Sequence, residues 1–400
     1  MPEHAYAEFD KSPPRIGSID VFRGLVMFLM LSEALHLTSL ARSFPDSQFC
    51  EWLRFHWSHV AWEGCSLHDL IQPGFTFLVG VSLPFSLASR RLKGHSLTWM
   101  MLHALWRALL LIVIGIALRS LGQDQTNFTF EDTLTQIGMG YFFLFLIGLM
   151  PKWLHYVFVV LVLGGFWVAF AVSDPPPVDF DYSAVGVSES WSHHNEGFQS
   201  RWNKNSNLSW QVDRWFMNLF PRESEFVYNS GGYSTLSFVP TLGTMLLGLL
   251  AGGWLMQEMQ PTSRVAVFIA AIGVCLAGGW TLSEYGYCPN VKRIWTTSFA
   301  LWSGGFCFAT LLVLHLICDV GRLRAWAFPF LVIGANSILI YVMSWTVREP
   351  IEDLLLRHLG SRPFQIFGEE FEGLLLGTAT LLIMFYVLWW LYRRRVFVRI

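Results

Sequence analysis

The fold of this 400-residue chain is decided at residues 55–91, which read FHWSHVAWEGCSLHDLIQPGFTFLVGVSLPFSLASRR. The second half, from Ile71 to Ala88, is an apolar run long enough to cross a bilayer, where every backbone polar group must be bonded within the helix. Ionisable groups are costly to keep beside a membrane, so a cluster of them at the entrance to this helix is a candidate functional site. The first half holds such a cluster, formed by His56, His59, Glu63, His68 and Asp69.

The composition is that of a membrane protein. Hydrophobic residues make up 53% of the chain and charged residues only 14%, whereas soluble domains carry about 25% charged residues. A formal net charge of −2 and the lack of a dense basic tract give no sign of a nucleic-acid partner. We therefore expect the lipid bilayer, and no nucleic acid, as a partner.

Apolar windows of about 18 to 25 residues, the length that crosses a hydrocarbon core of about 30 Å, recur along the whole chain. They predict an all-α, polytopic integral membrane bundle of about ten transmembrane helices, forming a single domain over residues 1–400. The windows fall at roughly 17–41, 69–90, 98–121, 133–150, 152–173, 234–256, 264–283, 294–318, 326–347 and 372–392.

The basic residues of the short connections indicate the orientation. Arg90, Arg91, Lys152 and Arg393–Arg395 lie on the side of the two termini, and short cytoplasmic loops are enriched in Lys and Arg. We therefore expect cytoplasmic termini. His59 and the long polar segment 174–233 are then extracytoplasmic.

Within that segment, residues 205–219 carry a cap-like NSN followed by apolar residues on one helical face. An amphipathic helix lying on the membrane surface is one interpretation. The other is a sugar-binding surface, because aromatic faces and amide groups suit carbohydrate rings. It would be built from Trp191, Trp202, Trp210, Trp215, His194, Asn203, Lys204 and Asn205.

The histidine cluster allows catalysis. An imidazole can act as a nucleophile or a general base near neutral pH, and a nearby carboxylate fixes its tautomer and raises its basicity. Glu63 or Asp69 could orient His59 in this way, and Asp69 lies at a helix start, where negative charge is favoured. The histidine spacing matches no common zinc motif, so we predict no metal. The structural alternative is that these side chains cap the helix and bond the loop.

Other polar side chains fall inside apolar windows, where they need partners. Asp20 with Arg23 predicts an ion pair at one end of the first window, and Glu33 with His36 has the same three-residue spacing. His103 and Arg107 predict an inter-helix hydrogen bond. Three further residues are candidates for polar lining or anion binding: Lys292, Asn336 and Ser337.

Small residues and cysteines have simpler interpretations. The glycines at 243, 248, 252 and 253 predict close helix packing. Six cysteines show no CxxC spacing, and a disulfide between Cys50 and Cys65 is compatible with their loop positions.

The order of several motifs resembles the heparan-alpha-glucosaminide N-acetyltransferase family of transmembrane acyltransferases, including bacterial members. The motifs are SIDVFRGLVMFLM, HVAWEGCSLHDLIQPGFTFLVGVS, GYSTLSFVPTLGTMLLGLLAG, VKRIWTTS and GANSILIYV. In the family's helix-2 block, a catalytic histidine precedes a Trp by three residues, a Gly by five, an Asp by ten and a Pro by fourteen. Here these positions are His59, Trp62, Gly64, Asp69 and Pro73.

The chain departs from the family pattern at two places. Ala34, with Glu33 beside it, stands where the family has an asparagine near the end of helix 1. The family's basic Pro-Gly segment before helix 4 is replaced by FTFEDTLTQ.

The resemblance implies a bacterial inner-membrane acyltransferase. It would move acetyl from cytosolic acetyl-CoA to an amino sugar or glycan on the far side, and a homodimer is an open alternative. On this hypothesis His59 is the nucleophile or base, Asp69 is its orienting carboxylate, and Glu33 is a second acid–base group. The candidate substrate-binding residues are Trp62, Glu63, His56, Lys292, Asn336 and Ser337. The rival hypothesis is an amino-sugar or small-solute transporter without covalent chemistry, whose intramembrane polar residues form a path. An assembly or scaffold protein is a third alternative.

Overall fold

The computed structural model describes residues 16–398, and in this part of the chain the regular structure is helical, with a single isolated β-bridge between Glu63 and Val291. Its contacts form two compact units. The first unit contains Trp62–Gly64 and Thr76–Leu312. The second contains Ile16–Ala61, Cys65–Phe75 and the described part of Val313–Ile400.

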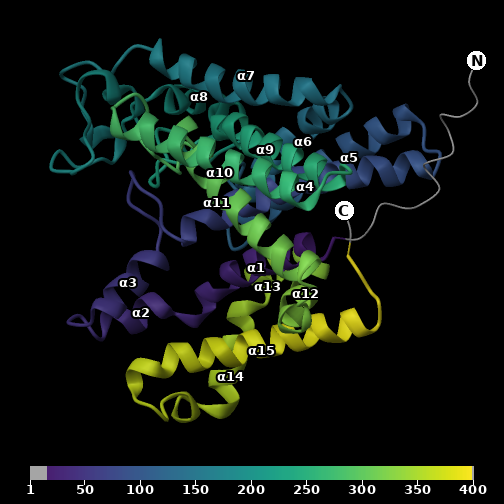
Figure 1. Ribbon diagram of the computed structural model, residues 1–400. Helices are drawn as coiled ribbons and strands as arrows, with labels where there is room; N and C mark the ends of the chain where they lie inside the picture. The colour runs from purple at the N-terminus through teal and green to yellow at the C-terminus, as the bar shows by residue number, and fades with distance from the viewer. Residues whose placement is uncertain (1–15, 399–400) are drawn as a thin grey trace, which may run out of the picture. The chain divides into compact units, whose positions relative to one another are not determined.

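The first unit holds the long helices of the middle of the chain (Figure 1). Helix α4 enters it from the second unit, which contains its first turn. The α-helices are α4 (Ile71–Leu92), α5 (Leu97–Arg119), α6 (Thr133–Gly148), α7 (Lys152–Ala171), α8 (Leu208–Phe216), α9 (Phe238–Met256), α10 (Pro261–Glu284) and α11 (Thr297–Leu314). Short 3-10 helices lie at Ser183–Val185, Gly197–Trp202, Met217–Leu219 and Thr235–Ser237.

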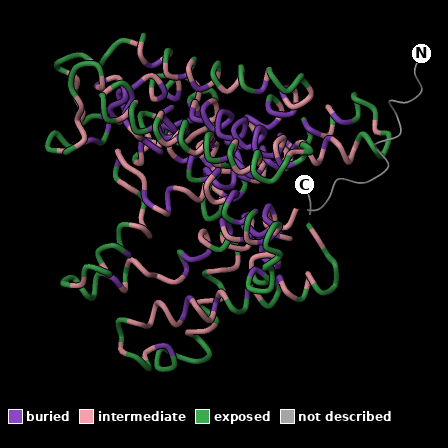
Figure 2. The backbone as a smooth tube through the Cα atoms, viewed as in Figure 1, coloured by how far each residue is buried: buried purple, intermediate pink, exposed green. Residues whose placement is uncertain are grey.

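Helix α9 is the core of the first unit, and Figure 2 shows buried backbone gathered around it. Glycines let α4 approach it closely. A Cβ at Gly248 would lie 2.0 Å from the Phe77 carbonyl oxygen, and one at Gly252 would lie 2.3 Å from that of Val81. Gly243 faces the Leu163 side chain of α7. The packing role predicted for these three glycines is confirmed, whereas a Cβ at Gly253 would meet nothing within 4 Å.

Two local sequence predictions in this unit are confirmed. The Asn207 side chain accepts a hydrogen bond from the backbone N–H of Trp210 and begins helix α8, as the NSN cap predicted. The Arg107 guanidinium of α5 donates to the Tyr141 hydroxyl of α6 at 3.3 Å, which is an inter-helix hydrogen bond. The prediction made for His103 and Arg107 holds for Arg107 only, because among the described residues the buried Nδ1 of His103 has no hydrogen-bond partner.

The second unit consists of the two ends of the chain and the loop that carries the histidines. Its α-helices are α1 (Gly17–Leu31), α2 (Leu37–Arg42), α3 (Gln48–His56), α12 (Phe328–Ala335), α13 (Ser337–Thr346), α14 (Arg348–Leu359) and α15 (Glu372–Arg393). Short 3-10 helices lie at Ser32–Leu35 (η2), His68–Leu70 (η3), Ala325–Ala327, Arg362–Phe364 and Glu369–Phe371, and a π-helix at His315–Val320.

Helix α1 is held at its start and along its length. Asp319 accepts hydrogen bonds from the backbone N–H groups of Gly17 and Ser18, at 3.0 and 3.3 Å. A Cβ at Gly24 would lie 1.8 Å from the Phe330 carbonyl oxygen, so α1 and α12 pack at backbone distance. The predicted ion pair between Asp20 and Arg23 is confirmed at 3.2 Å.

Within residues 16–398, seven helices are long and apolar enough to cross a membrane, or eight if the bent pair α12–α13 is counted as one span. The chain is therefore an all-α integral membrane protein, but the predicted count of about ten is not confirmed. Two predicted windows correspond to shorter helices, namely α1 with 15 residues and α6 with 16. The first window is interrupted at His36, whose positive φ of 49° ends η2, and α12 and α13 meet at an angle of 70°.

Candidate active site

The loop between α3 and η3, which carries His59 and is called the histidine loop below, is held by contacts at both of its ends within the second unit. Helix α3 begins at the Ser47 side chain, which accepts from the Cys50 N–H. After α3 ends, the Trp57 indole donates to the Ser32 hydroxyl at 2.9 Å, and the Leu67 N–H donates to His56 Nδ1 at 3.2 Å. His56 therefore has a structural role, because its Nδ1 accepts a hydrogen bond from the backbone of the loop.

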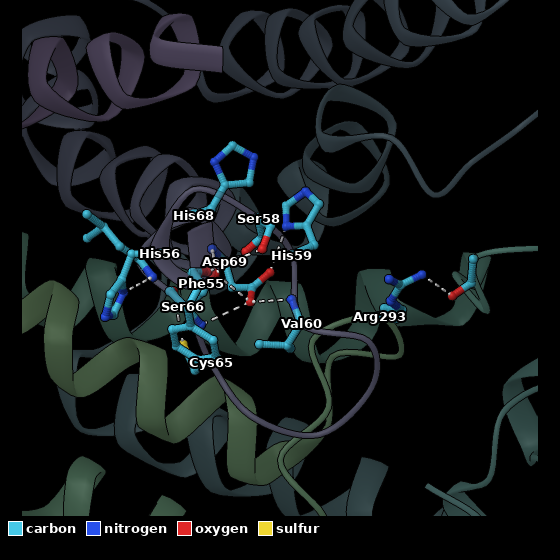
Figure 3. Close-up of polar contacts among 12 residues, drawn as sticks. Phe55, His56, Ser58, His59, Val60, Cys65, Ser66, His68, Asp69 and Arg293 are labelled. Atoms are coloured by element: carbon cyan, nitrogen blue, oxygen red, sulfur yellow. Dashed lines mark hydrogen bonds and ion pairs between the residues drawn. The ribbon is translucent and has the colours of Figure 1, made fainter. Parts of the chain in front are cut away.

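Asp69 is the centre of the polar contacts in this loop (Figure 3). Its side chain has no exposed surface. Oδ2 accepts from the backbone N–H groups of Ser66 and Val60, at 3.0 and 3.3 Å, and the Ser66 hydroxyl lies 3.0 Å from the same oxygen. A buried carboxylate needs several donors to stay charged. The other carboxylate oxygen, Oδ1, contacts a histidine.

That partner is His59, whose Nδ1 lies 2.7 Å from Asp69 Oδ1 (Figure 3). An ionised carboxylate can only accept, so Nδ1 carries the hydrogen and Nε2 keeps its lone pair. The His59 side chain remains 37% exposed. The predicted pairing of His59 with a carboxylate is therefore present, and of the two candidates the structure selects Asp69.

A second histidine–carboxylate pair lies beside the first. His68 Nε2 is 2.8 Å from Glu33 Oε1, and the His59 and His68 rings are 4.4 Å apart. Within residues 16–398 no hydrogen bond reaches His68 Nδ1. Glu33 therefore pairs with His68, and not with His36 as its three-residue spacing suggested, because the left-handed residue His36 ends the short helix that carries Glu33.

Two residues predicted to bind substrate, Trp62 and Glu63, belong to the first unit. Trp62 is fully buried and packs in a core cluster with Phe170 and Trp202, so its surface is not available to a ligand. Glu63 forms the β-bridge with Val291, and its carboxylate accepts from the Asn195 side chain at 2.6 Å. These contacts give both residues a structural role.

The remaining predicted lining residues are distributed over both units. Lys292 lies in the first unit and is 6% exposed. Asn336 lies in the second unit, fully buried at the break between α12 and α13, where its side chain donates to the Val396 carbonyl and accepts from the Val398 N–H. Ser337 is half-buried at the start of α13. The Asn336 amide is thus already engaged by the chain's own backbone.

The predicted sugar-binding surface of segment 174–233 is wrong for three of its residues. Trp202, Asn203 and Asn205 are buried, at 1, 2 and 3% exposure. The Asn203 amide donates to the Tyr182 hydroxyl and to the Asn195 carbonyl. A surface built from these side chains is therefore not available, because the segment folds around them.

The sequence analysis assigned no role to two residues that contact the histidine–carboxylate pair. His68 was counted in the cluster but given no role, and Ser66 was not singled out. Ser66 and Asp69 have the S-x-x-D spacing of a capping box before an apolar run, and the structure has the Asp69 N–H donating to the Ser66 hydroxyl at 3.3 Å. That spacing was the available signal.

Two other features were considered for this loop, namely a disulfide and a metal site. Cys50 and Cys65 are not joined by a disulfide. Among residues 16–398, no group of three or more His, Cys, Asp or Glu side chains could hold a metal ion.

These features define a class, namely a helical membrane protein with a partly exposed, carboxylate-bound histidine suited to acyl or proton transfer. The chain is 24% identical to heparan-alpha-glucosaminide N-acetyltransferase of Homo sapiens over 434 residues, which cover 97% of this chain and 60% of the human protein. It is 23% identical to the Mus musculus protein of the same name over 381 residues, covering 83% of this chain and 53% of the mouse protein. No protein-family model matches the chain.

The predicted resemblance to the heparan-alpha-glucosaminide N-acetyltransferases is confirmed by these matches. The chain spans little more than half of the length of these relatives.

Proposed function

We propose that this chain is a membrane acetyltransferase in which His59 receives the acetyl group and passes it to an amine. The observation that carries the proposal is the 2.7 Å contact between His59 Nδ1 and the fully buried Asp69 carboxylate. A histidine held in this tautomer presents Nε2 as a nucleophile. The similarity to named acetyltransferases supports the same activity.

The donor proposed is acetyl-CoA. In the first step His59 Nε2 attacks the thioester carbonyl carbon, so an N–C bond forms, the C–S bond breaks and the CoA thiolate leaves with the electron pair. The imidazole then carries a positive charge, which the Asp69 carboxylate stabilises through Nδ1–H. Because that carboxylate is already surrounded by donors, it does not need to rearrange during the step.

The acceptor proposed is the amine of an amino sugar or glycan. In the second step its nitrogen attacks the acetyl carbon, and the bond from that carbon to His59 Nε2 breaks. The amine must lose a proton during this step. His68 is placed to accept that proton at Nδ1, because its Nε2 faces Glu33 and its ring lies 4.4 Å from that of His59. Glu33 is then the second acid–base group.

The test is transfer of labelled acetyl from acetyl-CoA to the purified protein, followed by release to glucosamine. We expect the wild type to carry label and His59→Ala to carry none. His56→Ala is the matched control, because His56 is in the same loop but only accepts a backbone hydrogen bond. It should keep most of the activity. Equal loss in the two variants would remove the support for His59.

A transporter remains the second candidate function because of one observation. The α12–α13 pair is bent by 70° at Asn336, and discontinuous membrane helices are typical of transporter binding sites. Uptake of glucosamine into liposomes that contain the protein, without any consumption of acetyl-CoA, would favour this alternative over acetyl transfer.

A further inference from the structure

A polar pocket in the first unit has no part in the proposed chemistry. It has a volume of about 440 Å³ and is formed by residues 127–131, between α5 and α6, and by residues 213–233 of the polar segment. This volume is within the range of small-molecule sites in proteins. The His59 pair belongs to the other unit, and neither His59 nor Asp69 lines this pocket.

Arg222 provides a fixed positive charge at this pocket. Its Nε donates to the Met217 carbonyl at 2.7 Å and its Nη2 to the Phe128 carbonyl at 2.5 Å, so the guanidinium bridges the two segments that form the pocket. Among the described residues, Nη1 has no hydrogen-bond acceptor. This leaves N–H groups on a rigidly held side chain available to a ligand.

Two carboxyl groups supply acceptors to the same pocket. Glu131 accepts from the Thr129 hydroxyl and from the Asn229 side chain. Asp213 is 4% exposed and accepts from the Thr235 N–H. The pKa of Asp213 is raised to about 7, mainly by burial and also by the charge of Glu131, while the Thr235 hydrogen bonds and Arg222 oppose the rise. Near neutral pH this carboxyl group therefore donates a hydrogen bond in part of the molecules and accepts in the rest.

Aromatic rings complete the lining. Phe226 lies against the Arg222 guanidinium, 5.4 Å from ring centroid to Cζ. Tyr228 is positioned by Gly186, whose φ is +69°, and a Cβ there would lie 2.4 Å from the Tyr228 ring. The absence of a side chain at Gly186 thus allows the ring to pack on the backbone at the pocket's edge. Tyr233 also lines the pocket.

We propose that this pocket binds a pyranose sugar ring, either free or as a unit of a glycan. Such a ring needs donors and acceptors for its hydroxyl groups and an aromatic surface for its C–H face, and the Arg222, Glu131 and Tyr228 side chains supply all three. The two carboxyl groups disfavour an anionic ligand such as a phosphate. The polar lining disfavours an apolar ligand, because its hydrogen-bonding groups would lose water without gaining a partner.

The experiment measures binding of N-acetylglucosamine, and of its β-linked disaccharide, to the full chain in detergent by saturation-transfer NMR and titration calorimetry, without acetyl-CoA. We expect millimolar or tighter binding. Glu131→Gln and Tyr228→Leu should each weaken it about tenfold, as expected for the loss of one charged hydrogen bond or one ring contact. Glu225→Gln is the matched control, since Glu225 is in the same segment but does not line the pocket.

Tighter binding of the disaccharide would identify a glycan, and equal binding of both sugars a free sugar. The proposal is overturned if the wild type binds neither sugar, or if Glu131→Gln and Tyr228→Leu bind as tightly as the wild type. Thermal unfolding of each variant establishes that it is folded, and Ser230→Ala, which removes one hydroxyl from the lining, provides a milder substitution. Because sugar binding is measured without acetyl transfer, a lack of binding would not contradict the role proposed for His59.

Discussion

The His59 side chain keeps about a third of its surface exposed, whereas its partner Asp69 has none. This difference separates the two roles in the pair. The exposed imidazole can reach a substrate, and the buried carboxylate, held by Val60, Ser66 and their hydrogen bonds, can only orient it. At the residue scale, the proposed function therefore depends on a carboxylate that orients the histidine without contacting the substrate.

The first prediction concerns this carboxylate. Asp69→Asn keeps the size of the side chain but removes the charge that fixes the His59 tautomer, so acetyl transfer should fall by about 100-fold or more. Ser66→Ala removes one contact to Asp69 and leaves the charge, so its loss should be about tenfold or less. Rates with acetyl-CoA and glucosamine check both values. An Asp69→Asn variant as active as the wild type would contradict the assigned role.

The second prediction concerns Asp213. Because its pKa is raised from 3.8 to about 7 in the folded protein, the folded state binds more protons than the unfolded state between about pH 4 and pH 7. The contribution of this group to the free energy of unfolding is therefore full at low pH and is lost as pH rises through 7, by at most about 4 kcal/mol.

Asp213→Asn removes this contribution. Thermal unfolding in detergent from pH 4 to pH 8 should show the Tm of the wild type declining relative to that of the variant as pH rises. Parallel profiles for the two proteins would contradict the raised pKa. Glu225→Gln serves as the control carboxylate, and its profile should follow that of the wild type.

At the element scale, glycines set how closely helices approach. In α9, the face that carries Gly248 and Gly252 lies against the backbone of α4, while Gly253 is open. In the second unit, a Cβ at Gly377 of α15 would lie 1.6 Å from the Ala34 carbonyl oxygen. Glu33 precedes Ala34 in η2, so this contact helps to place the carboxylate that pairs with His68.

The third prediction compares two glycines of α9. Gly248→Ala would place a methyl group 2.0 Å from a backbone oxygen, so the helices must separate, and we expect destabilisation of about 1 to 3 kcal/mol. Gly253→Ala meets nothing within 4 Å and should stabilise the helix by about 0.5 to 1 kcal/mol. Thermal unfolding of both variants checks the opposite signs. A similar Tm for both would contradict the close packing.

At the scale of the whole molecule, the basic residues of the short connections predict the orientation in the membrane. Arg90 and Arg91 lie in the last turn of α4, and Arg393 lies in the last turn of α15. In the described part of the chain, seven helices are long enough to span the membrane, or eight with the bent pair as one span, and this count does not include the shorter helices α1 and α6. Whether the number of spans is odd or even depends on these elements.

The fourth prediction is that both termini are cytoplasmic. Reporter fusions that are active only in the cytoplasm should be active at either end, and periplasmic reporters should be inactive there. The same periplasmic reporter inserted in the polar segment near Asp179 should be active. Opposite results at the two ends would mean an odd number of spans.

The sequence by itself determined which parts of the chain are helical and apolar, because hydropathy and helix-ending signals are local. The cap of α8 at Asn207 and the close-packing role of Gly248 were predicted correctly for this reason. The residues alone left Glu63 and Asp69 as alternative partners of His59, and the family motif favoured Asp69, which contacts His59 in the structure.

The tertiary structure alone decided the partners that are distant in the chain. Glu33 pairs with His68, 35 residues away, and not with His36, because one left-handed residue after η2 redirects the chain. Trp62, Asn203 and Asn205 resemble surface residues in the sequence, yet the polar segment folds over them. Burial and long-range pairing depend on where several elements meet in space, and that information is not contained in any local pattern.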